Sequence, residues 1–259
     1  MTGLAKRIPG RNSSTAVMAQ RAPKQVDSDD PQKALWRSLD FFATPPWGTR
    51  AGAEIVRRLA PEAEIVWDPA CGDGIMAEPL REYFPQVLAS DIHDHGYRLG
   101  HRLDFLLDTN GMRGEVDLVM TNPPFALAAE FLQHGLEVAR VGVALLLRLS
   151  FLESCPRYVP LYRARDRMTL CAPFCERLSM QLGPWNPEAS SATAYAWFLF
   201  LKGREPMPID PVPPGTEARL TRRDDIRRFV AATPTPLFAN HLSERTDSVL
   251  DDVETQPTG

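Results

Sequence analysis

One short loop constrains the fold of this chain more than any other feature. It directly follows an apolar stretch at residues 64–67, directly precedes a periodic apolar stretch at residues 74–84, and reads Asp68-Pro69-Ala70-Cys71-Gly72-Asp73-Gly74. Gly72 and Gly74 allow the backbone to turn tightly and to approach a ligand closely, because neither residue carries a Cβ atom. The pattern predicts a strand, a glycine loop and a helix in immediate succession.

The rest of the chain continues this alternation of strands and helices. We predict further helices at residues 49–59 and 126–139, and further strands at residues 86–90, 116–120, 141–149 and 195–201. The stretch at residues 116–120 is apolar at nearly every position, as expected of a strand that is covered on both faces. We therefore expect an α/β fold with a mostly parallel sheet and helices on both of its faces. Ligands of such sheets bind beyond the carboxyl ends of the strands.

Length, charge and composition narrow the classes of protein to which this sequence can belong. The chain has 259 residues, of which 44% are hydrophobic, enough for one sizeable core. Its net charge of −4 gives no global positive field, so nucleic acid would have to bind at a local basic patch. The sequence shows no signal peptide and no apolar stretch long enough to span a bilayer. We therefore expect a cytoplasmic protein with no membrane partner, and the pattern leaves the oligomeric state open.

The distribution of polar residues predicts one folded unit between two tails. Residues 1–30 are polar, carry scattered Lys and Arg and lack periodicity, which is typical of a disordered basic arm. Such an arm either contacts phosphate groups or is simply solvated. Residues 31–235 are expected to form a single domain, and residues 236–259 a flexible tail.

An acidic residue near the glycine loop suggests which kind of ligand the loop holds. Asp91 ends the second predicted strand, 17 residues after Gly74 (91 − 74 = 17), where a carboxylate can accept hydrogen bonds from both hydroxyls of a ribose. The third glycine of a G-x-G-x-x-G fingerprint is missing, which disfavours a pyrophosphate cofactor. A nucleoside with a charged amino-acid tail fits better, because Asp68 and Asp73 can meet its positive charges. An ordinary tight turn is the alternative interpretation.

A second constrained segment directly follows the strand predicted at residues 116–120, and it reads Asn122-Pro123-Pro124-Phe125. The two prolines fix φ at two positions and remove two backbone donors. The side-chain oxygen of Asn122 and the carbonyl oxygen of Pro123 can then accept both hydrogens of an amino group, which frees the lone pair of its nitrogen. Phe125 offers a flat apolar face for a planar substrate. A proline-stiffened loop that only packs is the alternative.

Both segments resemble motifs of the amino-group DNA methyltransferases. The glycine loop matches motif I of that family, D-P-x-C-G-x-G, and the proline tetrapeptide matches motif IV, N/D-P-P-Y/F. Residues 41–47 resemble motif X, Asp104 with Phe105 resembles motif III, and residues 146–154 and 195–200 resemble strands of phage and prophage adenine methylases. The resemblance covers residues 41–202. It implies a Rossmann-like methyltransferase fold with an antiparallel last strand and S-adenosyl-L-methionine as cofactor.

The resemblance also implies residue roles. The Thr-Pro segment of motif X would close over the methionine end of the cofactor, and the motif III pair would contact its adenine. The implied catalytic residues are Asn122, Pro123, Pro124 and Phe125. The implied cofactor-binding residues are Thr44, Pro45, Asp68, Ala70, Cys71, Gly72, Gly74, Asp91, Ile92, Asp104, Phe105 and Asn122.

The resemblance implies that the protein methylates the exocyclic N6 amine of adenine in DNA. DNA is therefore its expected partner. Cytosine N4, an RNA base and a protein glutamine are alternative targets. A further alternative is that the protein is a non-catalytic relative that binds nucleic acid. Asn122 favours adenine, because the cytosine-N4 tetrapeptide more often begins with Ser or Thr. The Thr-Pro-Pro-Trp segment before motif I favours DNA. The transfer needs no metal, so no metal ligand is expected, although His93, His95 and His101 cluster after the second strand.

The region available for target recognition is short. It covers residues 154–191 and contains several arginines interleaved with tyrosines, a combination that suits phosphate contacts and base stacking. A solvated basic face explains the same residues nearly as well. The nucleic-acid contacts predicted from it are Arg157, Arg163, Arg165 and Arg167.

Overall fold

The computed structural model describes residues 30–107 and 112–230. The predicted tail at residues 236–259 and all of the predicted arm except Asp30 lie outside the described residues, as do residues 231–235 of the predicted domain. One seven-stranded sheet has the strand order β3-β2-β1-β4-β5-β7-β6. Its strands are β1 (Ile65–Asp68), β2 (Gln86–Asp91), β3 (His101–Arg102), β4 (Leu118–Thr121), β5 (Gly142–Arg148), β6 (Leu170–Pro173) and β7 (Tyr195–Leu201).

The directions of the strands confirm the predicted sheet. Strands β1 to β5 pair in parallel, and β7 runs antiparallel to both of its neighbours, β5 and β6. The sequence did not predict β3 and β6. The first has only two residues, both exposed, and the second has four residues that end in a proline, so neither shows a clear apolar alternation.

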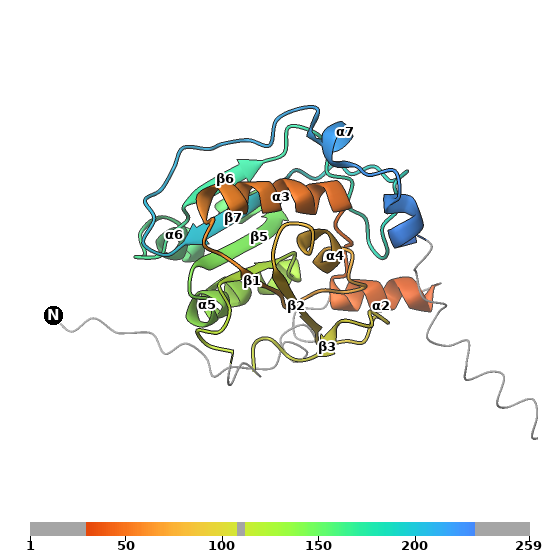
Figure 1. Cartoon of the computed structure of the whole chain (residues 1–259), viewed down its shortest axis with the longest axis horizontal. Helices are drawn as coiled ribbons and strands as arrows, with labels where there is room; N and C mark the ends of the chain where they lie inside the picture. Colours follow the sequence, from red (N-terminus) through yellow and green to blue (C-terminus); the bar gives the residue numbers. More distant parts are fainter. Residues whose placement is uncertain (1–29, 108–111, 231–259) are drawn as a thin grey trace, which may run out of the picture.

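Six α-helices and several shorter helical turns precede, connect and follow the strands in the described part of the chain (Figure 1). The α-helices are α2 (Pro31–Leu39), α3 (Pro46–Leu59), α4 (Ala77–Leu80), α5 (Ala128–Val138), α6 (Tyr158–Tyr162) and α7 (Thr216–Leu220). The 3₁₀ turns are η1 (Phe125–Leu127), η2 (Leu149–Leu152) and η3 (Cys155–Arg157), and a π-helical turn, η4, covers Ile226–Val230.

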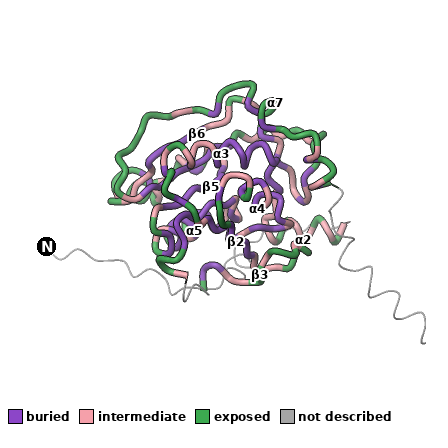
Figure 2. The backbone as a smooth tube through the Cα atoms, viewed as in Figure 1, coloured by how far each residue is buried: buried purple, intermediate pink, exposed green. Residues whose placement is uncertain are grey.

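Helices cover both faces of the sheet, and alternate strand residues contribute to two cores. Figure 2 shows that the buried residues concentrate in the central strands and the helices beside them. Leu118, Met120 and Ala144 point to the face that α3 and α4 cover, whereas Val119 and Val143 point to the face that α5 covers. The alternation explains why the predicted strands are apolar along their whole length. It also leaves the ends of the strands as the place where polar groups can gather.

Helix α3 lies unusually close to the antiparallel strand β7. A Cβ atom at Gly52 would lie 2.3 Å from the Trp197 ring, so only glycine fits at that point of the helix. The indole nitrogen of Trp197 donates a hydrogen bond of 2.9 Å to the carbonyl oxygen of Gly48. This close contact fixes the start of α3, and with it the segment that precedes the helix.

The helix predicted at residues 74–84 is much shorter in the structure. Only Ala77–Leu80 form an α-helix, and the flanking residues form turns. Gly74 has φ +85°, which excludes it from a right-handed helix. Pro79 has no N–H to donate within the helix. The sequence showed the apolar periodicity of this segment but overestimated its regular length.

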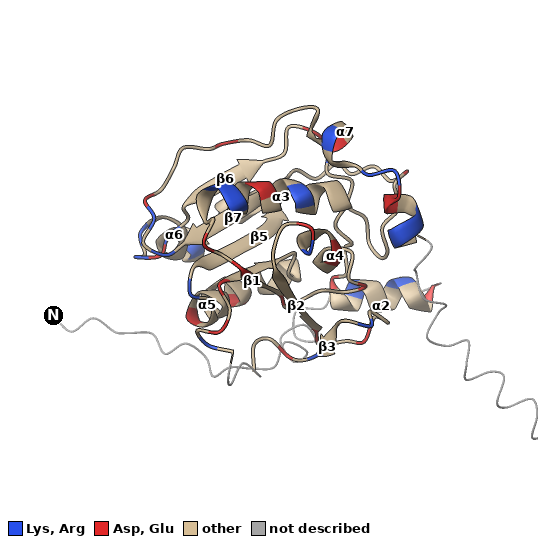
Figure 3. Cartoon of the chain, in the orientation of Figure 1, with Lys and Arg blue, Asp and Glu red and all other residues tan. Residues whose placement is uncertain are grey.

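A buried ion pair holds the last described segment against α3. The Arg50 side chain is 1% exposed and donates two hydrogen bonds of 2.7 Å to the Asp225 carboxylate, which is also 1% exposed. Its Nε donates to Glu82 at 2.8 Å. Other charged residues of both signs are interspersed over the surface elements (Figure 3).

Candidate functional site

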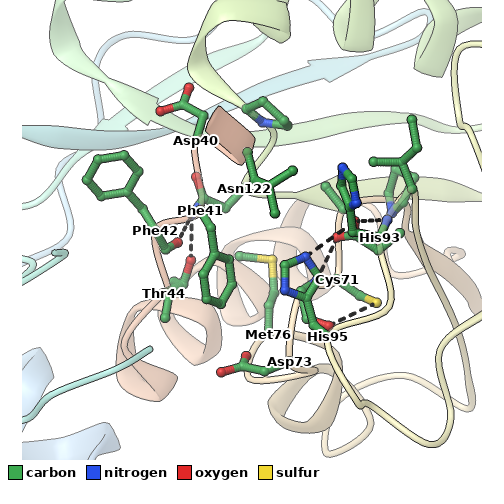
Figure 4. Close-up of a pocket in the computed structure, with 18 of the residues that line it drawn as sticks. Asp40, Phe41, Phe42, Thr44, Cys71, Asp73, Met76, His93, His95 and Asn122 are labelled. Atoms are coloured by element: carbon green, nitrogen blue, oxygen red, sulfur yellow. Dashed lines mark hydrogen bonds and ion pairs between the residues drawn. The ribbon is translucent and has the colours of Figure 1, made fainter. Parts of the chain in front are cut away.

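A cavity lies where the parallel strands end at their carboxyl termini, as predicted for this class of sheet. Its volume is about 250 Å³, and we call it the edge cavity. Its lining comes from the loops after β1, β2 and β4, from α2 and from residues 40–44 (Figure 4). Its lining includes eight predicted cofactor-binding residues: Thr44, Ala70, Cys71, Gly72, Asp91, Ile92, Phe105 and Asn122.

The glycine loop adopts the turn that its sequence requires. Gly72 has φ +52° and Gly74 has φ +85°, conformations that glycine adopts without strain. The N–H of Gly72 donates to Asp91 Oδ2 at 2.9 Å, which joins the loop to the end of β2. A Cβ atom at Gly72 would lie 2.6 Å from the Phe41 ring, so the loop and the segment above it meet at van der Waals distance.

Asp91 and His95 both line the edge cavity and form a polar group there. Figure 4 shows His95 beside His93. Asp91 Oδ1 accepts a hydrogen bond from the N–H of His93 at 2.9 Å and lies 3.7 Å from His95 Nε2. Burial alone would lower the pKa of His95, but the neighbouring Asp91 carboxylate outweighs it and raises that pKa. The His95 ring stacks on Phe41 with 4.8 Å between ring centroids. His93 and His95 therefore belong to the loop near the cavity.

Asp68 lies behind the glycine loop and does not line the cavity. Its side chain is completely buried, and its Oδ1 accepts a hydrogen bond of 2.7 Å from the Thr121 hydroxyl. Its Oδ2 is buried and has no hydrogen-bond partner among the described residues. Burial raises the pKa of Asp68 to about 7, although the bond from Thr121 acts in the opposite direction. Burial also raises the pKa of Asp73, which does line the cavity.

Asn122 is held with one particular orientation of its amide. Its Nδ2 donates to the carbonyl oxygen of Phe42 at 2.7 Å and to the Thr44 hydroxyl at 3.1 Å (Figure 4). Its Oδ1 is buried and accepts no hydrogen bond from the described residues. Because burying an unpaired acceptor is unfavourable, this oxygen is suited to receive a hydrogen from a ligand.

The other residues of the proline tetrapeptide frame this asparagine. Pro123 is buried, Pro124 lines the edge cavity, and Phe125 begins the turn η1. The centroid of the Phe125 ring lies 5.5 Å from the centroid of the Phe42 ring. The guanidinium carbon of Arg148 lies 4.4 Å from the Phe125 centroid. An aromatic cluster with a cationic neighbour therefore adjoins Asn122.

The structure places the residues that resemble motifs X and III differently with respect to the edge cavity. Thr44 lines it and contacts Asn122, whereas Pro45 caps the start of α3 and is not part of the lining. Phe105 lines it and packs edge-on against Trp67. Asp104 does not line it, and its Oδ1 accepts a hydrogen bond from the N–H of Leu106 at 3.1 Å. The predicted contact between Asp104 and an adenine stays a prediction.

The four arginines predicted to contact nucleic acid differ in how far they are free to do so. Arg157 donates hydrogen bonds to the carbonyl oxygens of residues 150, 151 and 153. Arg167 forms an ion pair of 3.0 Å with Glu205. Arg163 donates to the Tyr158 hydroxyl at 2.7 Å, and Arg165 is exposed. A role of these residues in DNA binding stays a prediction.

Sequence reasoning missed several residues that shape this site. Helix α2 was not predicted, yet Leu35, Leu39 and Asp40 line the edge cavity. A local signal for the helix existed, because the Asp30 side chain accepts hydrogen bonds from the N–H groups of Gln32 and Lys33, and Pro31 follows it. No local signal could have shown that Asp40 reaches the tetrapeptide loop.

Two further properties concern metals and membranes. In residues 30–107 and 112–230, no three His, Cys, Asp or Glu side chains gather as metal ligands would. Over the same ranges, every helix is too short or too polar to cross a lipid bilayer.

Comparison with known proteins identifies the fold. The sequence matches no protein-family model and no curated protein. A structure described as a class I S-adenosylmethionine-dependent methyltransferase from Listeria monocytogenes is 14% identical with a TM-score of 0.51, covering 73% of this chain and 74% of that one. The predicted Rossmann-like methyltransferase fold is thereby confirmed.

Two other solved structures are similar at a lower level. One is described as an RNA methyltransferase from Pyrococcus horikoshii; it is 16% identical with a TM-score of 0.49, covering 73% of this chain and 98% of that chain. The other is described as a modification subunit of a type I restriction enzyme from Vibrio vulnificus. It is 16% identical with a TM-score of 0.46, and the match covers 76% of this chain and 55% of that one.

Proposed function

We propose that this protein transfers a methyl group from S-adenosyl-L-methionine to the exocyclic N6 amine of adenine in DNA. The observation that carries the proposal is the orientation of Asn122. Its Nδ2 is fixed by Phe42 and Thr44, and its buried Oδ1 is left without a donor among the described residues. An acceptor held in this way can receive one hydrogen of an amino group and direct the lone pair of its nitrogen.

The residues in and behind the lining of the edge cavity support binding of this cofactor. Gly72 lines the cavity in a conformation that favours glycine, and the Asp91 carboxylate at the end of β2 can accept hydrogen bonds from ribose hydroxyls. When the Asp68 carboxylate is ionised, its unpaired Oδ2 supplies negative potential behind the loop for a positively charged amino-acid tail. Bound there, the cofactor supplies an electrophilic methyl group on a sulfonium.

The residues of the chain would prepare the amine for this electrophile. Asn122 would accept a hydrogen from the amine, and the aromatic face of Phe125 would hold the planar ring of the substrate. Stacking against an aromatic ring is the usual way to hold a base that has left the double helix. No general base is required beforehand, because the nitrogen becomes acidic only after it is methylated.

Several features favour adenine in DNA over the alternatives. The tetrapeptide begins with Asn122, which resembles the adenine-N6 type more than the cytosine-N4 type. The Thr44-Pro45-Pro46-Trp47 segment resembles motif X of DNA enzymes, and Thr44 contacts Asn122 directly. Arg163 and Arg165 lie in the segment proposed to contact the phosphate backbone. An RNA base and a protein glutamine are the competing substrates that the same chemistry would accept.

Labelled methyl transfer tests the proposal directly. The protein is incubated with methyl-labelled S-adenosylmethionine and, separately, with unmethylated DNA, total RNA and cell protein, and labelled DNA is then digested to nucleosides. We expect N6-methyl-2′-deoxyadenosine as the labelled product. Label only in RNA or protein would overturn the substrate, and no label in any of the three would overturn the enzymatic proposal.

The cofactor half of the proposal has its own measurement. Isothermal titration calorimetry with S-adenosylhomocysteine should show one binding site per chain. The Asp91→Ala variant should bind more weakly because it loses the proposed ribose acceptor. A matched variant, Asp210→Ala, removes an exposed carboxylate that pairs with Arg58 and should bind like the unmodified protein.

A further inference from the structure

Arg148 ends strand β5 beside the tetrapeptide loop, at the same edge of the sheet as Asn122, which follows the parallel strand β4. Its Nε is buried and has no hydrogen-bond acceptor among the described residues. Each N–H of a guanidinium is a strong donor, and leaving one buried without an acceptor is unfavourable. The packing around Arg148 therefore leaves a directed donor unused beside the tetrapeptide loop.

The charge of Arg148 is stabilised although this donor is unused. Its guanidinium carbon lies 4.4 Å from the centroid of the Phe125 ring and 5.7 Å from that of Phe42, so two aromatic rings contact the cation. The nearby carboxylate of Asp40 adds electrostatic attraction, while its Oδ2 accepts the hydrogen bond from the N–H of Phe125. Arg148 is thus held in place by contacts that do not occupy its Nε.

Phe42 connects this arginine with the asparagine of the tetrapeptide. Its carbonyl oxygen orients the amide of Asn122, and its ring contacts the guanidinium of Arg148. The residues that carry an unpaired acceptor, Asn122 Oδ1, and an unpaired donor, Arg148 Nε, therefore both contact Phe42, Asn122 through the main-chain carbonyl oxygen and Arg148 through the ring. Figure 4 shows Asp40, Phe42 and Asn122 gathered on this side of the edge cavity.

This set of groups complements one class of ligand. An aminoheterocycle has an amino group that donates and, beside it, a ring nitrogen that accepts, and its flat face packs on aromatic rings. In adenine, the ring nitrogens N1 and N7 both flank the N6 amine. A glutamine side chain also has a donor and an acceptor, but it lacks the aromatic face.

We propose that Arg148 is a specificity-determining residue that donates a hydrogen bond from Nε to a ring nitrogen beside the amine of the target base. The proposal rests on the proposed function, because it places that base against Asn122 and Phe125. A site that is built to hydrogen-bond a ligand group discriminates strongly against a ligand that lacks the group.

Ligand binding tests Arg148 separately from methyl transfer. The probe is 2′-deoxyadenosine 5′-monophosphate, titrated into the full chain in the presence of S-adenosylhomocysteine, with NMR detection of the arginine Nε–H signals. We expect the Arg148 signal to shift on addition of the nucleotide. The Arg148→Met variant, which keeps the apolar stem, should bind the nucleotide about 10-fold more weakly or worse.

Two analogues distinguish a direct contact from a structural role. In the 1-deaza and 7-deaza nucleotides, one flanking ring nitrogen is replaced by carbon. For the analogue that lacks the contacted nitrogen, Arg148→Met should weaken binding no further, whereas the other analogue should behave like the natural nucleotide. Equal losses with all three ligands would show that Arg148 only supports the fold, and would overturn the proposal.

Matched variants complete the test. Arg148→Lys keeps the charge but lacks Nε, so it should not restore the discrimination between the analogues. Arg223→Met removes an exposed arginine outside the site and should leave binding unchanged. Binding of N-acetylglutaminamide that depends on Arg148, with no binding of the nucleotide, would overturn the proposal in favour of a protein substrate.

The outcomes also separate this proposal from the proposed function. If the nucleotide binds through Arg148 but the protein methylates no DNA, the role of Arg148 stands and the DNA substrate is wrong. If the protein methylates adenine in DNA but Arg148→Met binds every nucleotide normally, the proposed function stands and the role of Arg148 is wrong.

Discussion

The Oδ2 atom of Asp40 accepts a hydrogen bond of 2.6 Å from the main-chain N–H of Phe125, 85 residues further along the chain. Asp40 caps the carboxyl end of α2 in the left-handed conformation, with φ 52°. Asp adopts that conformation more readily than most residues. One carboxylate therefore joins the helix that covers the edge cavity to the loop that carries Asn122.

Replacing Asp40 by Ala should uncouple these two elements. The Phe125 N–H would be left without its acceptor, which typically lowers the free energy of unfolding by about 1–3 kcal/mol. Methyl transfer should fall by about 10-fold or more because the loop loses its position. Urea denaturation and labelled methyl transfer measure the two effects. Asp40→Asn keeps an oxygen and tolerates the same backbone conformation, so it should retain most of the activity. Equal damage by both substitutions would contradict this role.

Asn122→Ala should abolish methyl transfer and reduce cofactor affinity far less. The substitution removes the acceptor proposed for the amine, whereas the glycine loop and Asp91 remain in place. Turnover with labelled cofactor and calorimetry with S-adenosylhomocysteine measure the two quantities. Asn122→Asp keeps acceptor oxygens but loses the Nδ2 donor to Phe42 and Thr44, so partial activity is expected from it. Near-normal turnover of Asn122→Ala would refute the assigned mechanism.

The two motif loops could be predicted from the sequence because their conformations depend on local constraints. Gly72 and Gly74 do adopt positive φ angles, and the tetrapeptide does follow the end of a buried strand. Asp40 and Arg148 could not be assigned in this way. Their partner is Phe125, and only the folded sheet brings these three positions together.

Regular elements show the same division between local and long-range information. The central strands β4 and β5 were predicted within a few residues, because both of their faces are buried and their sequences are uniformly apolar. Strand β3 is exposed and forms only because the end of β2 offers it a partner. Helix α4 is short because backbone constraints at Gly74 and Pro79 override the apolar periodicity.

Gly72→Ala should weaken cofactor binding. The new Cβ atom would lie 2.6 Å from the Phe41 ring, and φ +52° disfavours alanine in addition. Calorimetry with S-adenosylhomocysteine measures the loss of affinity. Gly203→Ala is a matched control, because Gly203 has φ +70° and a Cβ atom added there would meet no other atom within 4 Å. It should show the backbone strain alone, with normal cofactor affinity.

A second variant separates the steric clash from the strain. Combining Gly72→Ala with Phe41→Ala removes the ring that the new methyl group would meet. The double variant should bind the cofactor more tightly than Gly72→Ala alone, if the clash is the main cause. No recovery would assign the effect to the backbone conformation of the loop.

Arg50→Met should strongly reduce stability. It would leave the Asp225 carboxylate, 1% exposed, without its guanidinium partner, and breaking such a buried pair lowers the free energy of unfolding by about 3–5 kcal/mol. Arg219→Met is the matched control, because Arg219 and Glu54 form an exposed pair at 2.7 Å. Its loss should be below about 1 kcal/mol. Urea denaturation of both variants gives the comparison, and similar losses would contradict the structural role of Arg50.

Asp68 should make the stability of the ligand-free protein depend on pH. Burial raises its pKa from the ordinary value of 3.8 to about 7. Between these two values the folded protein holds a proton that the unfolded chain has lost. The free energy of unfolding should therefore decrease as the pH rises through this window, by on the order of 4 kcal/mol at most, and the contribution should stay constant above about pH 7.

Urea denaturation at several pH values between 5 and 8 measures this effect, with Asp68→Asn as the variant that cannot titrate. The difference in unfolding free energy between the two proteins should change with pH in the direction given above, whereas parallel pH profiles would contradict a raised pKa.

Cofactor binding should depend on pH in the opposite sense. Only the ionised carboxylate attracts a positively charged amino-acid tail, so affinity should increase as the pH rises through 7, and Asp68→Asn should lose that part of the increase.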